Sequence, residues 1–374
     1  MSYAFVGLSL MGLLSASMLA IDVGMLMTAR AQAQNAADAG ALAGATALLY
    51  NDYNDRTATG PAVTSAIGAA IRNKVMWGDV SVTPEDVEFP NDEAGQPNRV
   101  QVTVYRRGDR GNPLSTHIAR FFGMATVGVA AVATAEVSPA NAMTCVKPFT
   151  IPDRWIERQT PAWDMSDTYD AYDSRGNPLP PAEADQYVPA DQPGYTGYNQ
   201  ESNRGQLLML RAQNGSNISP SMFFSYAIAD VTGASAYEWN IANCNTHIMH
   251  WGDRLLHEPG AMAGPTVASI QALIDRDPSA VWDTNTNTIA NSAYGGQQSP
   301  RVFPIPLYDP IIYDSGQRLG RGADLVVANW IGFFAERTIG NREVWGRIIP
   351  INGIRDRYAT SPEGLFPKSL RLVQ

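Results

Sequence analysis

The chain has 374 residues, of which 45% are hydrophobic and 17% are charged, and its formal net charge is -9. This length and composition allow sizeable buried cores, so we expect a folded chain with more than one domain. The acidic balance argues against nucleic-acid binding, which needs a clustered basic surface.

The first fifty residues are the most distinctive part of the chain. From Met1 to Ala29 the only charged side chain is Asp22, and this apolar run exceeds the roughly 20 residues that a helix needs to cross a bilayer. We therefore expect a transmembrane helix. A secretory signal peptide fits less well, because no basic residue precedes Arg30 and the run is too long. A buried core helix of this length would carry a polar stripe.

The helix is expected to continue beyond the apolar run. An Ala-rich segment follows with no proline before Pro61, so one helix from Tyr3 to Tyr50 would be roughly 70 Å long. Small residues recur on one side, including Gly40 and Gly44, and would let another backbone approach closely. Two alternatives stay open: this stripe packs on another chain, or on the chain's own globular part. The predicted helix-packing residues are Asp22, Gly24, Ala33, Ala36, Ala37, Gly40, Ala41, Gly44 and Ala47.

Asp22 is unusual because a carboxylate in hydrocarbon costs a few kcal/mol. The simpler interpretation places it at the water boundary, about one turn before the polar half of the helix. The alternative is a neutralising contact with a helix of another subunit. The segment has no further acid, which argues against a proton relay.

The stretch AIDVGMLMTARAQAQNAADAGALAGATAL, Ala20 to Leu48, resembles the N-terminal signature of the TadE/TadG-like proteins of the Flp, or tight-adherence (Tad), pilus machinery. In that family an apolar helix runs into a D-V-G step and then into a Q-N-A-A-D-A-x-A-L-A-G-A block. The step corresponds to Asp22–Gly24 and the block to Gln34–Ala45, with Gly40 where Ala is more usual. Relatives usually carry a basic leader, which this chain lacks, so we expect its start to be a processed end or a truncated reading frame.

Residues 51–138 read as a small α+β layer that covers part of the long helix. This order is similar to the extracytoplasmic part of TadE/TadG-like proteins and, more loosely, to pilins. The expected elements are a helix opening at Pro61, a strand at Trp77–Thr83, a short strand at Val87–Phe89, a strand at Arg99–Arg107, a short helix within Ser115–Met124 capped by Ser115, and a strand at Val127–Val137.

Residues 139–374 read as a mostly β, loop-rich domain after a linker at Ser138–Thr144. The fold class is therefore α+β, with domains at 1–50, 51–138 and 139–374. The polar spans of 159–206 are expected to be packed loops, because disordered segments lack such aromatic residues as Trp155, Trp163, Tyr169, Tyr172, Tyr187, Tyr195 and Tyr198. Strands are expected at Gly205–Gln213, at Ser221–Asp230, from Arg301, from Ala323, from Glu343 and at the end of the chain, with a helix at Pro265–Asp275.

The only two cysteines are Cys145 and Cys244. In an exported chain they would form a disulfide, and closing a loop of about 100 residues contributes up to roughly 4.7 kcal/mol in the loop-entropy model. The alternative is two separate buried thiols.

Two groups of residues are candidate metal ligands, both weak. Asp164, Asp167, Asp170 and Asp173 repeat at every third position and are calcium candidates, although the EF-hand spacing is absent. His247 and His250, with His257-Glu258, lack the His-Glu-x-x-His spacing of zinc enzymes, so ordinary hydrogen bonding is favoured. We expect no resident cofactor.

No nucleophile elbow, phosphate loop or dinucleotide fingerprint is present, so we expect no catalytic residues. Some TadG relatives carry a von Willebrand A insertion whose metal site begins D-x-S-x-S after a strand. The nearest string here, Asp164-Met-Ser166-Asp-Thr168, follows RQTPAW instead, so we do not expect that insertion.

Together these features predict a non-enzymatic structural or assembly component of a Flp/Tad-type, type IV-like pilus. Its helix would insert into lipid or among other pilins and Tad proteins, with a head in the periplasm or on a cell-surface pilus. One alternative is a minor pilin or adhesin at a pilus tip that binds a surface ligand; a second is an exported, membrane-anchored hydrolase or metal-binding module. Insertion orientation stays open, because no basic residue precedes the helix.

Overall fold

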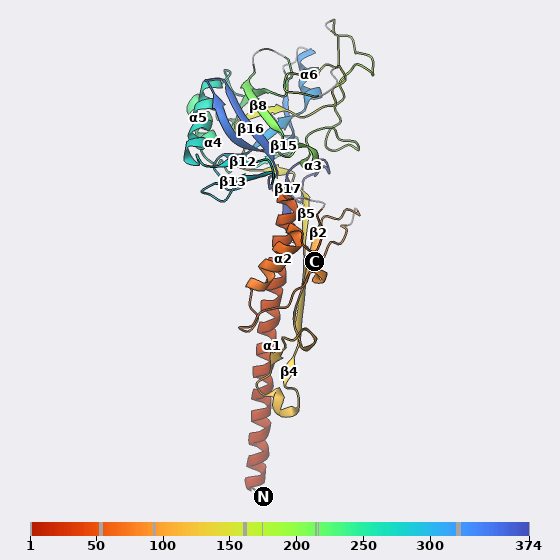
Figure 1. The fold of residues 1–374 in the computed structure, drawn as a ribbon, viewed down its shortest axis with the longest axis vertical. Coiled ribbons are helices and arrows are strands. Elements are labelled where there is room, and N and C mark those ends of the chain that lie inside the picture. The colour runs from red at the N-terminus through yellow and green to blue at the C-terminus, as the bar shows by residue number, and fades with distance from the viewer. Residues whose placement is uncertain are drawn as a thin grey trace. The chain divides into compact units, whose positions relative to one another are not determined.

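The computed structural model divides into two units (Figure 1). Unit 1 comprises Met1–Ser138 with Leu370–Gln374, and unit 2 comprises Pro139–Ser369. The last residues, which the sequence analysis assigned to domain 139–374, thus belong to unit 1. The structure describes residues 2–51, 55–92, 95–159, 163–173, 175–213, 215, 217–318 and 323–373.

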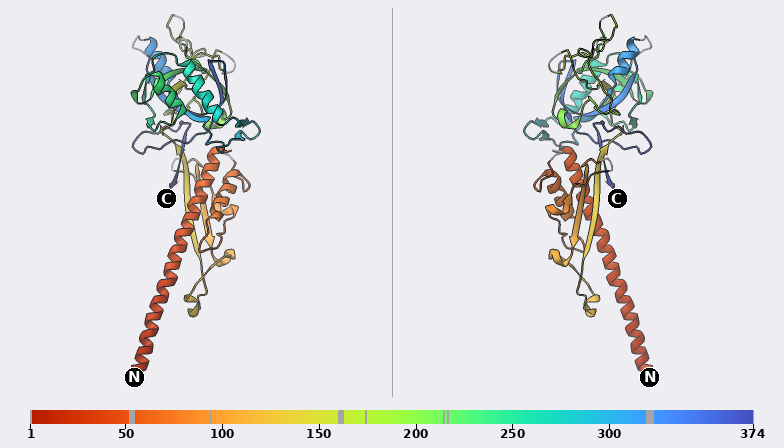
Figure 2. Two further views of the ribbon diagram at one scale, coloured as in Figure 1. Left: turned by 90° about the vertical axis from the view of Figure 1, so that its left-hand side faces the viewer. Right: turned by 90° about the vertical axis from the view of Figure 1, so that its right-hand side faces the viewer.

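Unit 1 is built on the helix α1, Ser2–Tyr50, which runs without interruption as predicted. Its first half stands clear of the other elements of unit 1 except for one loop that reaches Asp22, and its second half is covered by them (Figure 2). Among the described residues, no helix combines the length and the hydropathy that crossing a membrane requires, so the predicted transmembrane helix is not supported.

The second half of α1 packs on a helix and a sheet. The helix α2, Pro61–Arg72, begins with the predicted proline, whose fixed φ suits a first helical turn. The sheet has the order β1-β2-β5-β17. In β2, Val100, Val102 and Val104 are fully buried, as their alternation with polar residues predicts. The strands are β1 Val87–Glu88, β2 Arg99–Arg106, β5 Val129–Pro139 and β17 Lys368–Val373.

A buried carboxylate fixes the C-terminal strand in this sheet. Glu136 of β5 forms ion pairs of 2.8 Å with Arg99 of β2 and with Arg371 of β17. Burial acts to raise the pKa of Glu136, but the guanidinium groups of Arg371 and Arg99 outweigh it and hold that pKa below its usual range. One acidic side chain thus links three strands of unit 1.

Two predicted elements of unit 1 are wrong. Trp77–Thr83 is not a strand, because Met76 and Trp77 adopt positive φ in a tight turn between Val75 and Gly78. Ser115–Met124 is not an α-helix capped by Ser115, which instead lies in a strand. The short elements of unit 1 are η1 Pro84–Asp86, η2 Gly108–Arg110, β3 Leu114–Ser115, η3 Ala119–Phe122 and β4 Thr126–Val127.

Unit 2 is organised around a sheet that closes on itself. Its strands follow the order β11-β15-β14-β7-β9-β8-β16, and β16 also pairs with β15, which completes the ring. The neighbours β7 and β14, and likewise β8 and β9, are parallel. The bounds are β7 Phe149–Pro152, β8 Leu207–Ala212, β9 Met222–Ala227, β11 Arg254–His257, β14 Val302–Tyr308, β15 Leu325–Ile339 and β16 Glu343–Ile349.

Helices and loops cover this sheet. The neighbouring helices α4 and α5 lie against it through Tyr237, Val267 and Ile270, which share a core with Phe303 and Phe333 (Figure 2). The remaining elements are α3 Gln200–Asn203, α4 Ala234–Ala242, α5 Ala263–Arg276, α6 Pro310–Arg318, η4 Ile228–Asp230, and the pairs β6 Ala142–Met143 with β10 Met249–His250 and β12 Val281–Asp283 with β13 Thr288–Ala290.

The aromatic loops after β7 are packed, as predicted. Trp155, Tyr169, Tyr187 and Tyr198 are buried, and Trp155 meets Tyr169 edge to face at 5.5 Å. The predicted strands of unit 2 and the helix at Pro265–Asp275 are confirmed in outline. The sequence analysis missed α4 and α6, which are only nine residues long and so give a weak periodic signal.

Candidate assembly site on the N-terminal helix

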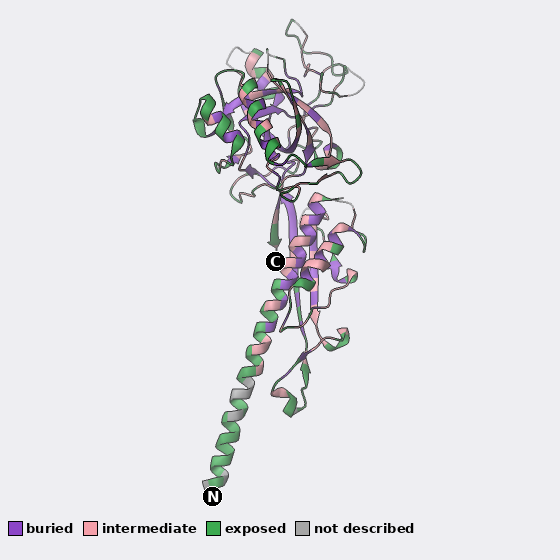
Figure 3. Cartoon of the chain, turned by 60° about the vertical axis from the view of Figure 1, so that its left-hand side comes forward, coloured by how far each residue is buried: buried purple, intermediate pink, exposed green. Residues whose placement is uncertain are grey.

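The first half of α1 carries a band of exposed apolar side chains. Leu8, Met11 and Leu13 are each about 70% exposed, and Gly7 and Gly12 have open space around them. Figure 3 shows this exposed half and the buried second half of the same helix. Contiguous apolar surface of this extent marks an interaction site. The large side chains of the band are Tyr3, Phe5, Val6, Leu8, Leu10, Met11, Leu13, Ile21, Val23 and Met27.

The stripe of small residues packs within the same chain. A Cβ atom at Gly44 would lie 2.8 Å from Val100 Cγ1 and 3.1 Å from Ala66 Cβ, and one at Gly40 would lie 3.1 Å from Val102 Cγ1. Of the two alternatives left open by the sequence, the structure shows packing on the chain's own α2 and β2. The predicted stripe residues that lie buried in this core are Ala33, Ala36, Ala37, Gly40, Ala41, Gly44 and Ala47.

Gly24 lies apart from this core. No atom comes within 4 Å of the position that its Cβ would occupy, so it belongs to the exposed half of the helix. The nine predicted packing residues therefore divide between an exposed and a buried part of α1.

Asp22 binds the backbone of a loop in the same unit. Its carboxylate accepts hydrogen bonds from the N–H groups of His117 at 2.8 Å, Ile118 at 3.0 Å and Ala119 at 2.6 Å. The donors Ala119 and His117 contribute most to holding the pKa of Asp22 below its usual range. The sequence analysis missed these partners, because they are 95 to 97 residues away and no local pattern marks them.

The predicted disulfide between Cys145 and Cys244 is present. Close to it in the sequence, the ammonium group of Lys147 donates to the backbone oxygens of Ile241 at 2.5 Å and Asn243 at 2.9 Å, at the C-terminal end of α4. Burial lowers the pKa of Lys147 to about 7. The bridge and the lysine thus fix the same end of α4.

The four aspartates of the calcium candidate do not converge on one site. Asp164 accepts from the amide and hydroxyl of its neighbour Ser166, and Asp173 accepts from the amide and side chain of Asn177. Asp167 and Asp170 make similar local contacts. Within the described parts of the chain, no three His, Cys, Asp or Glu side chains are grouped as metal ligands would be.

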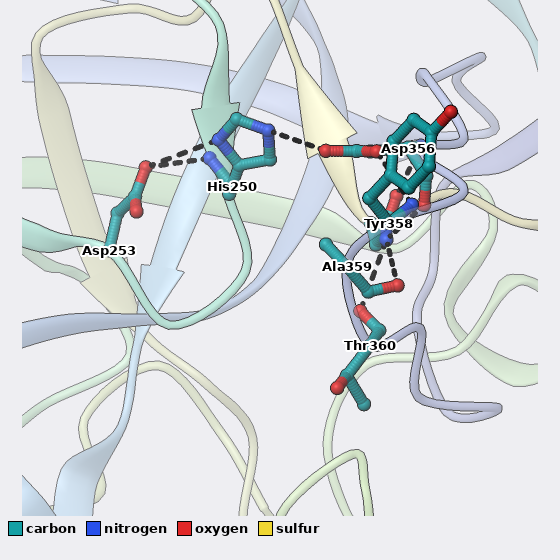
Figure 4. A network of polar contacts seen from close by, with 7 residues as sticks. His250, Asp253, Asp356, Tyr358, Ala359 and Thr360 are labelled. Atoms are coloured by element: carbon teal, nitrogen blue, oxygen red, sulfur yellow. Dashed lines mark hydrogen bonds and ion pairs between the residues drawn. The ribbon is translucent and has the colours of Figure 1, made fainter.

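The candidate histidines are also separate. His257 contacts the carbonyl of Ala323, and Glu258 accepts from the amide of Gly233. The ring of His250 lies between two carboxylates, with Nε2 3.3 Å from Asp356 and Nδ1 3.9 Å from Asp253 (Figure 4).

Asn141 holds the segment that carries Asp356. Its side-chain amide donates to three backbone oxygens, those of Asp356, Ala359 and Thr360, and its oxygen accepts from the Asp356 amide. The network around His250 therefore stabilises a loop, and its members are too far apart in the sequence to be predicted together.

The chain thus has two units of mixed α+β structure. Its N-terminal helix is packed within unit 1 over its second half, and its first half exposes apolar side chains.

One comparison finds a similarity, and it covers the N-terminal part of the chain. Residues 1–47 match the family model described as Tad, putative Flp pilus-assembly TadE/G-like. This match confirms the resemblance carried by Ala20 to Leu48 and indicates a pilus-associated role at the envelope or cell surface. No curated protein and no solved structure matches the chain.

Proposed function

We propose that the protein is a non-enzymatic assembly component of a Flp/Tad-type pilus, attached to its partners through the exposed half of α1. The observation that carries the proposal is the band of exposed apolar side chains within the 47 residues that match the TadE/G-like model. Burying one such leucine or phenylalanine contributes roughly 1.5–3 kcal/mol, so covering several of them supplies a strong attachment.

The small-residue stripe has a different role in this proposal. Gly40 and Gly44 let α2 and β2 approach the helix closely, so the second half of α1 anchors the helix in the core of unit 1. The first half is left for partners, which we take to be helices of other pilus components.

The test replaces Phe5, Leu8 and Leu10 together by serine in the cell that makes the pilus. All three side chains are more than half exposed, so the substitutions leave the cores of both units intact. We expect loss of the protein from the fraction, filament or envelope, that holds the unaltered protein, and a fall in sheared filaments. Serine at Leu256 and Ile339, which are exposed apolar residues of unit 2, is the matched control. Unchanged piliation and unchanged fractionation of the triple variant would refute the proposal.

The same fractionation distinguishes two forms of the role. Recovery of the unaltered protein in sheared filaments identifies a filament component, and recovery only with the cell envelope identifies an assembly factor.

A further inference from the structure

One loop of unit 1 is attached to α1 and carries exposed apolar groups. This segment, residues 116–125 and here named the pinned loop, lies between the paired strands β3 and β4 and contains η3 (Figure 1). Its ends are closed by Thr116, whose amide donates to Ala125 O at 3.1 Å and whose hydroxyl donates to Met124 O at 2.6 Å. The loop therefore has a defined conformation of its own.

Asp22 attaches the pinned loop beside the apolar half of α1. Three consecutive amides, of His117, Ile118 and Ala119, donate to its one carboxylate. Hydrogen bonds to an ionised acceptor are stronger than neutral ones. The loop is thus held at the level of Asp22, whose neighbours in the sequence, Ile21 and Val23, have exposed side chains.

Large apolar groups of the pinned loop face solvent. Phe121 is 72% and Met124 is 61% exposed, although the loop backbone is hydrogen-bonded, with Met124 N donating to Ala119 O at 3.0 Å. The guanidinium of Arg120 lies 5.1 Å from the centre of the Phe121 ring. An ordered loop with an aromatic, a flexible apolar side chain and a basic group has the composition of segments that rest in the boundary of a lipid layer.

We propose that the pinned loop is a contact site for an anionic lipid surface, with Phe121 and Met124 at the acyl boundary and Arg120 at the phosphate headgroups. Such a contact lies in the plane of the surface and needs no membrane-spanning helix. This contact would give the proposed pilus component a lipid partner. It rests on the proposed function in one respect, which is that α1 brings the loop to the cell envelope.

The charges favour lipid over the apolar half of α1 in a second copy of the chain as the occupant. The loop contains Arg120 and His117 and no acid, in a chain whose net charge is -9. The apolar half of α1 in another copy would offer only Asp22, which already accepts three hydrogen bonds, so Arg120 would lack a counter-charge there. Anionic headgroups supply one, and each basic residue near such a surface contributes about 1 kcal/mol.

The test places a single fluorescent label on the loop of the full-length protein. Because both native cysteines are in the disulfide, Met124→Cys gives one free thiol for an environment-sensitive dye. The labelled protein is mixed with vesicles of phosphatidylcholine alone, or of phosphatidylcholine and phosphatidylglycerol in equal parts, each with and without a quencher on the lipid chain.

Trp77→Cys is the matched control for the position of the label. Trp77 is 93% exposed in the same unit, and its neighbour Met76 is bonded to Gln32, which lies about 15 Å further along α1 than Asp22. A label at Leu8→Cys reports separately whether α1 itself enters an apolar environment, so failure of the loop contact is distinguishable from failure of the proposed function.

We expect the Met124 label to be quenched in phosphatidylglycerol vesicles and the Trp77 label to stay unquenched in both vesicle types. Arg120→Gln should reduce the preference for anionic vesicles about fivefold, which corresponds to ~1 kcal/mol. Equal exposure of the Met124 and Trp77 labels in all vesicles would overturn the proposal. A shift in the emission of the Met124 label that depends on protein concentration in the absence of lipid would also overturn it, because that result assigns the loop to contacts between copies of the chain.

Discussion

The close packing of Gly44 yields a quantitative prediction about α1. In Gly44→Ala the new methyl group would lie 2.8 Å from Val100 Cγ1 and 3.3 Å from Ala62 O, so a buried valine must shift. Overpacking of this kind costs typically 1–3 kcal/mol. The same substitution at Gly24 meets no atom within 4 Å and should gain the roughly 0.5–1 kcal/mol by which alanine is favoured over glycine inside a helix.

Because both glycines lie in one helix, the gain in helix propensity from glycine to alanine is the same in both variants and cancels when their stabilities are compared. Gly44→Ala should therefore be about 1–3 kcal/mol less stable than Gly24→Ala. The assay is hydrogen exchange of the α1 amides beyond Ala29 in the full-length protein, which reports the free energy of opening of unit 1. Equal protection in the two variants, or better protection in Gly44→Ala, would refute the packing of α1 on α2 and β2.

Three further predictions concern other parts of the chain. Asp22→Asn should speed amide exchange at His117 and Ala119 and leave exchange in β2 unchanged, because one acceptor serves three donors; unchanged exchange at these amides would contradict the attachment of the pinned loop. Replacing Cys145 and Cys244 by alanine should lower the stability of unit 2 in a denaturant titration by up to about 4.7 kcal/mol, since the bridge closes a separation of 99 residues; an unchanged midpoint would contradict this. Burial raises the pKa of Asp153 from 3.8 to about 6, so between these pH values the folded chain binds more protons than the unfolded chain. The free energy of unfolding should therefore fall by roughly 3 kcal/mol as the pH rises from about 4 to 7. Asp185 acts in the same direction, because burial and the Glu157 carboxylate raise its pKa, and Asp153→Asn should flatten the profile measured by thermal unfolding.

The features that the sequence predicts well are local ones. The absence of proline before Pro61 predicts the uninterrupted α1, and the alternation around Val102 predicts β2 with its buried face. The disulfide is predictable because the chain has only Cys145 and Cys244. The helix and the strand follow from residue types at a short, fixed spacing, and the disulfide follows from there being a single possible pair of cysteines.

The features that the sequence did not predict depend on distant partners. The alanine and glycine stripe is compatible with packing on any close backbone, and only the position of Val100 and α2 decides that the partner is the same chain. The carboxylate of Asp22 finds its donors almost a hundred residues away. The ring of strands in unit 2 likewise needs the pairing of β8 with β16, whose members Leu210 and Val344 are far apart in the sequence.

The central claim is that the exposed half of α1 is covered by partners in the cell. The direct measurement is the reaction of a water-soluble maleimide with Leu8→Cys and with Trp77→Cys in intact piliated cells. Both side chains are exposed in the free protein, at 70% and 93%. The account predicts that the cysteine at position 8 is protected while the one at position 77 reacts, and equal reaction at both positions would contradict it.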